Sequence, residues 1–297
     1  MTLNSLQGIE EATKPSSAKH PSNFSDLSAR FGHARPKPKP SHAYERANQT
    51  YWTDRAQSYS DQHVGELKGS QHNAWAQELD QHLIELAPNK DRSSVSVLDI
   101  GCGPGFFSII LAELGYNVVA IDYTNSMLDQ AKANALSASV DVAFHQMNAE
   151  ELAFEDHAFD AVVSRNLTWN LPHPSNAYHE WERILRPGGI MLNYDANWYG
   201  YLFNDQLRQG YEQDRANTAK TSFNDRYLHT DIPAMEKLAQ DVPLSAIARP
   251  QWDKLILEEF GFDVHIDHRV SDRVWSREEL INQSSTPLFG IKAIKAR

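Results

Sequence analysis

The chain has 297 residues, of which 23% are charged and 41% apolar, and its 28 Lys and Arg against 39 Asp and Glu give a formal net charge of −11. This length permits one large domain or two small ones with a sizeable core. The lone Cys102 excludes a disulfide scaffold and favours a reducing compartment. The acidic balance argues against broad binding to nucleic acid, because phosphate neutralisation needs an excess of Lys and Arg on one surface.

Neither a membrane span nor a targeting segment is indicated. The sequence has no run approaching the roughly 20 consecutive apolar residues that a membrane-spanning helix requires. The N-terminal residues lack the apolar core of a secretion signal, and Glu10 and Glu11 disfavour an organelle transit peptide. We therefore expect a cytoplasmic protein.

The first 50 residues are rich in Ser, Pro, Lys and His and include the run RPKPKP at 35–40. Alternating prolines impose an extended, solvated backbone that buries little surface. Residues 1–50 are predicted to form a disordered, mildly basic tail, and docking of this tail to an acidic partner stays open as the alternative.

A helix is predicted near 71–87, where Trp75, Leu79, Leu83 and Leu86 recur at steps of three and four. From residue 95 onwards, short β-branched runs alternate with helical segments. The expected strands are 95–100, 117–122, 140–146, 159–164, 190–195, 262–268 and 288–296, and the expected helices are 106–114, 125–136, 175–185 and 251–260. This alternation predicts a single α/β domain over 51–297, with a Rossmann-like, mostly parallel sheet covered by helices on both faces.

One region interrupts the alternation. Residues 198–250 combine aromatic and polar side chains between the expected strand at 190–195 and the next helix. Insertions of this size in a compact domain usually carry function. We expect residues 198–250 to form a lid over the substrate.

The sharpest motif is VLDIGCGPGFF at 97–107, in which a strand runs into a glycine-rich turn and then a helix. Glycines at 101, 103 and 105 let the backbone turn tightly and let a ligand approach closely. Asp122 ends the next strand about twenty residues later, where an acid accepts hydrogen bonds from ribose hydroxyls. An adenosine-type ligand is therefore predicted at the switch point of the sheet.

The residues around this turn favour a cationic nucleoside over a dinucleotide. The dinucleotide fingerprint requires a glycine at the sixth position, which is Phe106 here. Asp99, just before the turn, would repel a pyrophosphate and attract an ammonium or sulfonium group. The sign of this charge favours S-adenosylmethionine over NAD.

Three further motifs accompany the turn: NAEEL at 148–152, FDAVVS at 159–164 and LRPGG at 185–189. With them, the chain resembles class I S-adenosylmethionine-dependent methyltransferases, especially the small-molecule branch similar to quinone-biosynthesis methyltransferases. The resemblance covers 51–198 and resumes from 251 to the end. It implies a seven-stranded sheet in the order 3-2-1-4-5-7-6 with strand 7 antiparallel, and a helix ended by Pro187 with Gly188 and Gly189 turning into strand five.

The resemblance also implies roles in binding the cofactor. The three glycines would lie under its amino-acid moiety with Asp99 near the ammonium group, and Asp122 would bind the ribose. Asn148, where the family usually has Asp, and Ala149 would meet the adenine edge, and Tyr59 would close over the cofactor from an aromatic entry helix. The full set of expected cofactor-binding residues is Tyr59, Asp99, Gly101, Cys102, Gly103, Gly105, Asp122, Tyr123, Met127, Asn148, Ala149, Glu150, Arg165 and Asn166.

The stretch after the strand at 159–164 faces the methyl sulfonium in this family, which implies that Arg165, Asn166 and Trp169 lie near it. No run like Asn-Pro-Pro-Tyr or Asp-Pro-Pro-Tyr is present, which reduces the resemblance to amino-group methylases of nucleic acid bases. The expected acceptor is a small molecule, and no nucleic acid is expected to bind. The expected substrate-binding residues are Trp169, Tyr194, Trp198, Tyr201 and Tyr227.

Methyl transfer is an in-line displacement that releases S-adenosylhomocysteine, and the protein contributes mainly proximity and alignment. A base is required only if the acceptor loses a proton. The candidate bases are His173, Asp195 and His229, followed by Tyr194, Asp225 and Asp231. A catalytic metal is not expected, because HEWER at 179–183 is not the His-Glu-x-x-His zinc motif and no cysteine cluster exists.

Other function classes stay open. The chain could be a noncatalytic protein that binds an adenosyl ligand and contacts a partner through the insertion, or a methyltransferase acting on a protein or RNA. A nicotinamide-dependent oxidoreductase is a further alternative, which Asp99 and Phe106 disfavour. The sequence specifies neither the acceptor atom nor the oligomeric state, because this type of fold supports many chemistries.

Overall fold

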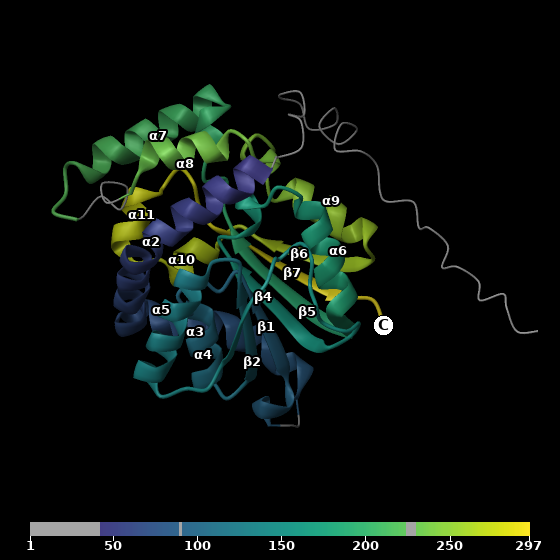
Figure 1. Cartoon of the computed structure of the whole chain (residues 1–297). Coiled ribbons are helices and arrows are strands. Elements are labelled where there is room, and N and C mark those ends of the chain that lie inside the picture. The colour runs from purple at the N-terminus through teal and green to yellow at the C-terminus, as the bar shows by residue number, and fades with distance from the viewer. Residues whose placement is uncertain (1–41, 89–90, 224–229) are drawn as a thin grey trace, which may run out of the picture.

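The structure is a computed structural model and describes residues 42–88, 91–223 and 230–297. In these residues, seven strands form one sheet in the order β3-β2-β1-β4-β5-β7-β6. Neighbouring strands from β3 to β5 are parallel, and β7 is antiparallel to both β5 and β6 (Figure 1). The predicted fold class is therefore confirmed. The strands are β1 Ser96–Ile100, β2 Asn117–Asp122, β3 Ala143–Gln146, β4 Phe159–Arg165, β5 Leu185–Asp195, β6 Phe262–Asp267 and β7 Phe289–Lys295.

Helices cover both faces of the sheet because its central strand is apolar on both sides. Leu98 and Ile100 of β1 pack in the cluster that includes α6 and α9, whereas Val97 points to the opposite face and packs with α3 and α4. α5 lies beside α4 over β2 and β3. The helices around the sheet are α3 Ser70–Leu83, α4 Phe106–Glu113, α5 Asn125–Ala138, α6 Pro174–Ile184, α9 Gln251–Glu259, α10 Val270–Val274 and α11 Arg277–Asn282, with 3-10 turns η1 Ile84–Leu86, η2 Arg92–Ser94 and η3 Thr168–Asn170.

The start of β5 differs from the expectation. The expectation was a helix that ends at Pro187, followed by a glycine turn into the strand. In the structure, α6 already ends at Ile184 and β5 begins at Leu185. Leu185 pairs with Phe159, and the register then shifts before Ile190 pairs with Ala161. The glycine pair therefore forms an irregularity within the strand, because Gly188 has a φ of +78° that breaks regular pairing.

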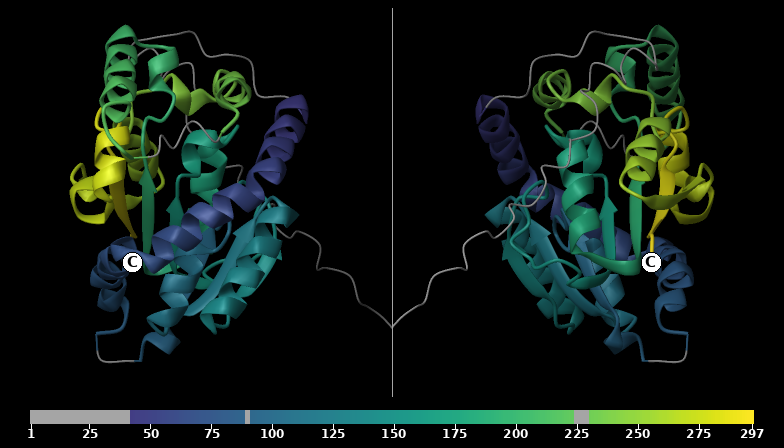
Figure 2. Two further views of the ribbon diagram at one scale, coloured as in Figure 1. Left: turned by 90° about the vertical axis from the view of Figure 1, so that its left-hand side faces the viewer. Right: turned by 90° about the vertical axis from the view of Figure 1, so that its right-hand side faces the viewer.

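A long helix, α2, spans His42–Lys68. The prediction of a disordered tail to residue 50 is therefore wrong for 42–50, and residues 1–41 of that tail lie outside the described residues. Tyr44 gives the physical reason, because its ring is buried and its hydroxyl donates to the backbone oxygen of Asn170 at 2.7 Å. α2 runs obliquely from beside the insertion to the helices on the sheet, packing on α3 and α5 (Figure 2).

The insertion between β5 and α9 folds into helices near the carboxyl ends of the strands (Figure 1). α8 packs on α2, and α7 packs on α11. In the parts of the chain that the structure describes, no helix is both long and apolar enough to cross a membrane. The elements of the insertion are η4 Gly200–Leu202, α7 Asp205–Thr218, α8 Ile232–Ala239 and η5 Pro243–Ser245.

Candidate functional site

A cavity opens at the carboxyl ends of β1, β2 and β4, beneath α2. Its empty volume of about 970 Å³ includes open solvent at the mouth. The position follows the rule that ligands of open α/β sheets bind beyond the carboxyl ends of the strands. The lining residues are Tyr44, Glu45, Asn48, Gln49, Trp52, Tyr59, Gly101, Gly103, Asp122, Tyr123, Thr124, Met127, Met147, Asn148, Ala149, Glu150, Arg165, Asn166, Leu167, Asn170, Leu171 and Pro172.

The glycine-rich turn forms the floor of this cavity. Gly101 and Gly103 line it with φ values of +68° and +53°, a region that side chains with a Cβ rarely adopt. A Cβ on Gly101 would stand 2.7 Å from Leu167 Cδ2, so the loop after β4 needs this glycine. Gly105 does not line the cavity. It is the residue before α4, where its φ of +90° and the close approach of Ala131 of α5 favour glycine.

Asp122 presents its carboxylate to the cavity from the end of β2. One oxygen accepts a hydrogen bond from the backbone N–H of Gly103 at 3.0 Å, and the other accepts from the N–H of Thr124 at 2.8 Å. Burial raises the pKa of Asp122, and these backbone hydrogen bonds oppose that rise. Each oxygen retains a lone pair, so the oriented carboxylate is equipped to accept from two adjacent hydroxyls.

Asp99 occupies a different place from the one expected. Its carboxylate is buried beneath the turn, accepts from Ser108 Oγ at 2.5 Å and does not line the cavity. Burial raises the pKa of Asp99 to about 7, so a fraction of the molecules are neutral at this position near neutral pH. Cys102 is likewise buried away from the cavity, and burial raises the pKa of its thiol.

The segment after β3 brings Asn148, Ala149 and Glu150 to the wall. The side-chain oxygen of Asn148 accepts from the backbone N–H of Glu150 at 3.0 Å, and Trp181 donates to the backbone oxygen of Ala149 at 3.0 Å. Asn148 therefore braces its own turn with the oxygen that was predicted to meet the adenine edge. One lone pair remains on that oxygen.

Glu150 is held against the cavity by His173. The backbone N–H of His173 donates to one carboxylate oxygen at 2.5 Å, and the ring Nδ1 lies 3.0 Å from the other. His173, a predicted base, does not line the cavity itself. The proton-accepting oxygens at this part of the wall therefore belong to Glu150.

The end of β4 contributes an ion pair and a strained residue. Glu66 of α2 accepts from both terminal nitrogens of Arg165 at 3.0 Å, and the Arg165 guanidinium lies 4.6 Å from the centre of the Phe106 ring. Asn166 has a positive φ of 57°, and its buried side-chain oxygen has no hydrogen-bond partner among the described residues. Strain and an unsatisfied buried oxygen beside a cavity are typical of binding sites.

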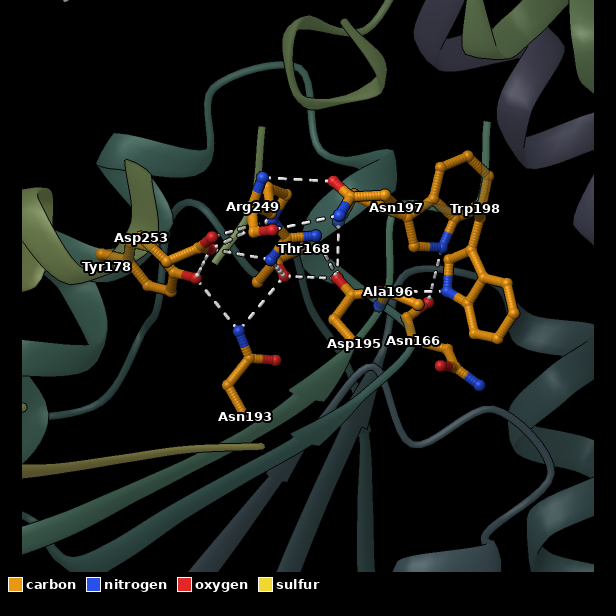
Figure 3. Close-up of polar contacts among 11 residues, drawn as sticks. Asn166, Thr168, Tyr178, Asn193, Asp195, Ala196, Asn197, Trp198, Arg249 and Asp253 are labelled. Atoms are coloured by element: carbon orange, nitrogen blue, oxygen red, sulfur yellow. Dashed lines mark hydrogen bonds and ion pairs between the residues drawn. The ribbon is translucent and has the colours of Figure 1, made fainter. Parts of the chain in front are cut away.

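The predicted base Asp195 is committed to a buried network instead (Figure 3). Arg249 donates to it at 2.6 Å, and both side chains have no exposed surface. Thr168 and the Trp169 backbone N–H donate to the same carboxylate oxygen. Through these hydrogen bonds Asp195 holds η3 in position, and it does not line the cavity.

The predicted substrate-binding aromatics also pack outside the cavity. Tyr194 is fully buried, with its ring centre 5.0 Å from that of Trp75. Trp169 and Trp198 contact the Asp195 network, and Tyr201 stacks on Tyr211 within the insertion with ring centres 4.1 Å apart. Asp231 caps the start of α8, where its side chain accepts from the N–H of Ala234. Tyr227, Asp225 and His229 lie outside the described residues.

The part of the wall that sequence reasoning missed comes mainly from α2. Tyr44, Glu45, Asn48 and Gln49 line the cavity, and so does Asn170 of η3. Trp52 also lines it, from the aromatic entry helix that the resemblance had implied. Their spacing places the α2 residues on one face of a helix. That spacing was visible in the sequence, but their position next to the Pro-rich tail and their mixed polarity concealed it.

Comparisons with known proteins agree with this geometry. The family model described as "Methyltransferase domain" matches residues 98–193. The chain is 37% identical over 110 residues to the ubiquinone biosynthesis O-methyltransferase of Alkalilimnicola ehrlichii, covering 36% of this chain and 44% of the relative. It is 34% identical over 110 residues to the enzyme of that name from Pseudomonas aeruginosa, covering 36% and 47%. The chain thus spans less than half the length of these curated relatives.

A solved structure confirms the fold. A putative S-adenosylmethionine-dependent methyltransferase from Listeria monocytogenes superposes with a TM-score of 0.51 and 20% identity, covering 76% of this chain and 99% of the other. Together with the family match, this confirms the predicted resemblance for the sheet and for residues 98–193. The matched segment holds Gly101, Asp122, Asn148 and Arg165, whereas α2 and the insertion lie outside it.

Proposed function

Because residues 98–193 form a methyltransferase domain, we propose that the chain binds S-adenosylmethionine in the cavity and transfers its methyl group to a small-molecule acceptor. The observation that carries the proposal is the convergence on one cavity of Gly101, Gly103 and Asp122 with the end of β4. These elements are far apart in the chain, and the sheet topology brings them together. Because the turn is built from glycines, no side chain blocks the approach of the ligand to the backbone of the turn.

The residues present fit this cofactor. Asp122 would accept from the two ribose hydroxyls with an orientation already fixed by Gly103 and Thr124. Tyr123 and Met127 would flank the adenine, since both line the cavity beside Asp122. The unsatisfied oxygen of Asn166 and the ring of Tyr59 would face the cationic end of the cofactor.

When bound, the cofactor supplies a methyl group that its positive sulfonium makes electrophilic. The chain's own contribution is alignment, which can be worth about 7–11 kcal/mol of the barrier in well-oriented systems. α2 supplies part of the wall of the cavity. If the acceptor must lose a proton, Glu150 supplies the nearest proton-accepting oxygens at the wall, and His173 holds them in place.

The acceptor of the curated relatives does not transfer directly to this chain. Their names refer to ubiquinone biosynthesis, but the family match ends at residue 193 and leaves out α2. α2 supplies Tyr44, Glu45, Asn48, Gln49, Trp52 and Tyr59 to the lining of the cavity. The proposal therefore stays with a small molecule and leaves its identity to the chemistry of that wall.

Titration calorimetry tests the cofactor. We expect micromolar binding of S-adenosylhomocysteine and no binding of NAD. Asp122→Ala should abolish binding, because it removes the acceptor of both ribose hydroxyls. Asp141→Ala, at an exposed position before β3, is the matched control and should bind normally. Tight NAD binding, or unchanged S-adenosylhomocysteine binding by Asp122→Ala, would refute the cofactor assignment.

A second experiment tests catalysis. The protein is incubated with labelled S-adenosylmethionine and either a metabolite extract or a macromolecular fraction. Label in small molecules is the expected outcome. Label confined to protein or RNA would overturn the small-molecule acceptor, and S-adenosylhomocysteine binding without any labelled product would support a noncatalytic binding protein.

A further inference from the structure

The lining of the cavity includes residues to which the proposed function assigns no cofactor contact: Glu45, Asn48 and Gln49 of α2, Asn170 of η3, and Glu150 of the segment after β3. They make up a second part of the lining. We propose that this second part binds a small acceptor that carries a positively charged amine, held between Glu45 and Glu150. The inference rests on the proposed function, because it assigns the acceptor of the same site.

The α2 side of this part is polar and acidic. Glu45, Asn48 and Gln49 lie on the face of α2 that lines the cavity, and Tyr44 and Trp52 flank them on the same face. The side chains at 45, 48, 49 and 52 repeat at helical spacing, so they present one continuous surface to the acceptor. A carboxylate, two amides and two aromatic rings are the groups that commonly bind an ammonium ion.

The opposite side is built by Glu150 and η3. His173 fixes the Glu150 carboxylate, whose side chain is 9% exposed, at the cavity wall. Asn170 accepts from Tyr44 at 2.8 Å and donates to Asn48 at 3.1 Å, which ties η3 to α2 across the cavity. The two carboxylates thus belong to walls that are held together by direct hydrogen bonds, and they form parts of one site.

Acidic residues outnumber basic ones among the described residues that line the cavity. Arg165 is the cation among the described lining residues, and Glu66 neutralises it through hydrogen bonds at 3.0 Å. The pKa of Tyr44 is raised well above its usual value by burial and by the negative charges of Glu150 and Asp241. Burial is the larger of these causes, and Glu150, a lining residue, adds to it.

This charge discriminates between classes of acceptor. A carboxylate-bearing molecule would be repelled by Glu45 and Glu150, since charges of like sign in a partly dry cavity interact strongly. A long apolar tail would have Leu167, Leu171 and Pro172 to contact on one side but amides and carboxylates on the other. A compact amine satisfies both sides.

Three fragments of one shape and different charge provide the test: benzylamine, benzyl alcohol and benzoate. Their dissociation constants are measured by NMR titration of the full-length protein saturated with S-adenosylhomocysteine. Benzylamine should bind at least about tenfold more tightly than benzyl alcohol, and benzoate most weakly. Raising the salt concentration should narrow these differences, because screening weakens charge interactions.

Glu45→Gln and Glu150→Gln should each reduce the preference for benzylamine over benzyl alcohol several-fold, because the amide keeps the shape and removes the charge. The affinity for S-adenosylhomocysteine should stay unchanged in Glu45→Gln. Every fragment affinity is measured at saturating S-adenosylhomocysteine, so a change of cofactor affinity in Glu150→Gln does not alter the comparison. Glu113→Gln, at the C-terminal end of α4 and outside the lining of the cavity, is the matched control.

Equal binding of the three fragments, tighter binding of benzoate, or a full preference for benzylamine in both variants would overturn the inference. The same applies if S-adenosylhomocysteine binds but no fragment does. Failure of S-adenosylhomocysteine itself to bind would instead refute the proposed function, so the two failures are distinguishable.

Discussion

Arg249, at the end of the insertion, donates from Nη1 to the Asp195 carboxylate at the end of β5 over 2.6 Å, with no exposed surface on either side chain. The same guanidinium donates to Thr168 and to Asp253. Asp195 in turn accepts from the backbone N–H of Trp169. One buried arginine thus ties the insertion, α9 and η3 to the sheet (Figure 3).

Replacing Arg249 by Met should lower the free energy of unfolding by about 3–5 kcal/mol, because Asp195 and Asp253 would remain buried without their cation. Equilibrium denaturation by urea measures the change. Arg269→Ala is the control: its side chain is 82% exposed and pairs with Asp272, and such surface pairs contribute about 0–1 kcal/mol. A loss of less than about 1 kcal/mol in Arg249→Met would show that the network does not stabilise the fold.

The sheet could be predicted from the sequence because its determinants are local. The strand at 96–100 is a short apolar run ended by glycine, and the β-branched runs at 117–122 and 159–165 are similarly bounded. Alternation of such runs with helices leaves few topologies. The floor of the cavity was equally readable, because Gly101 and Asp122 are required by backbone geometry and by the strand end.

The wall that α2 and η3 contribute to the cavity could not be predicted in the same way, because it depends on tertiary contacts. The aromatic residues of the insertion drew attention as ligand contacts, yet Tyr201 packs on Tyr211 and Trp198 bonds to Asp195. Asp99 appeared to face the ligand, but its side chain points under the turn to Ser108. Sequence spacing gives the face of an element, and only packing shows what covers that face.

Gly101 offers a test of the turn. An alanine there would adopt a φ of +68° and bring its Cβ to 2.7 Å from Leu167 Cδ2. We expect Gly101→Ala to cost about 1 kcal/mol for the backbone and a further 1–3 kcal/mol for the clash. Thermal and urea unfolding measure the loss.

Gly115→Ala separates the two contributions. Gly115 also has a positive φ, of +92°, but its nearest neighbour to an added Cβ, the Cβ of Arg92, is 4.0 Å away. This variant should therefore show the backbone cost alone. Combining Gly101→Ala with Leu167→Ala should recover the steric part as a favourable coupling energy. Equal losses in the two single variants would contradict the proposed clash.

Asp99 predicts how stability changes with pH. Burial raises its pKa in the folded protein to about 7, whereas an unfolded Asp titrates near 3.9. Between these values the folded state binds the proton and the unfolded state does not. This carboxyl group therefore contributes stability at low pH that is lost as the pH rises towards about 7, at up to about 1.4 kcal/mol per pH unit.

Asp99→Asn should remove that dependence, since the amide keeps a polar partner for Ser108 without a charge to bury. We expect the variant to gain stability relative to the parent from pH 5 to pH 8, as measured by urea unfolding at each pH. Asp263→Asn, at a side chain that is 75% exposed, serves as control for the loss of one surface carboxylate. A constant difference between Asp99→Asn and the parent across this range would show that Asp99 is ionised throughout.

The contact between Tyr44 and Asn170 should stabilise the start of α2 locally more than it stabilises the fold as a whole. Tyr44→Phe removes the donor to the backbone and side-chain oxygens of Asn170, which should cost about 0.5–1.5 kcal/mol. Because this bond lies in the first turn of α2, the loss should appear as amide exchange that is about 2–10-fold faster at 42–52, while the sheet stays protected. Tyr123→Phe lines the same cavity from the loop after β2 and should leave exchange in α2 unchanged. Unchanged exchange at 42–52 in Tyr44→Phe would mean that the packing of α2 on its neighbouring helices holds this segment over the cavity. The hydrogen bonds from Tyr44 to η3 would then have no part in positioning the wall.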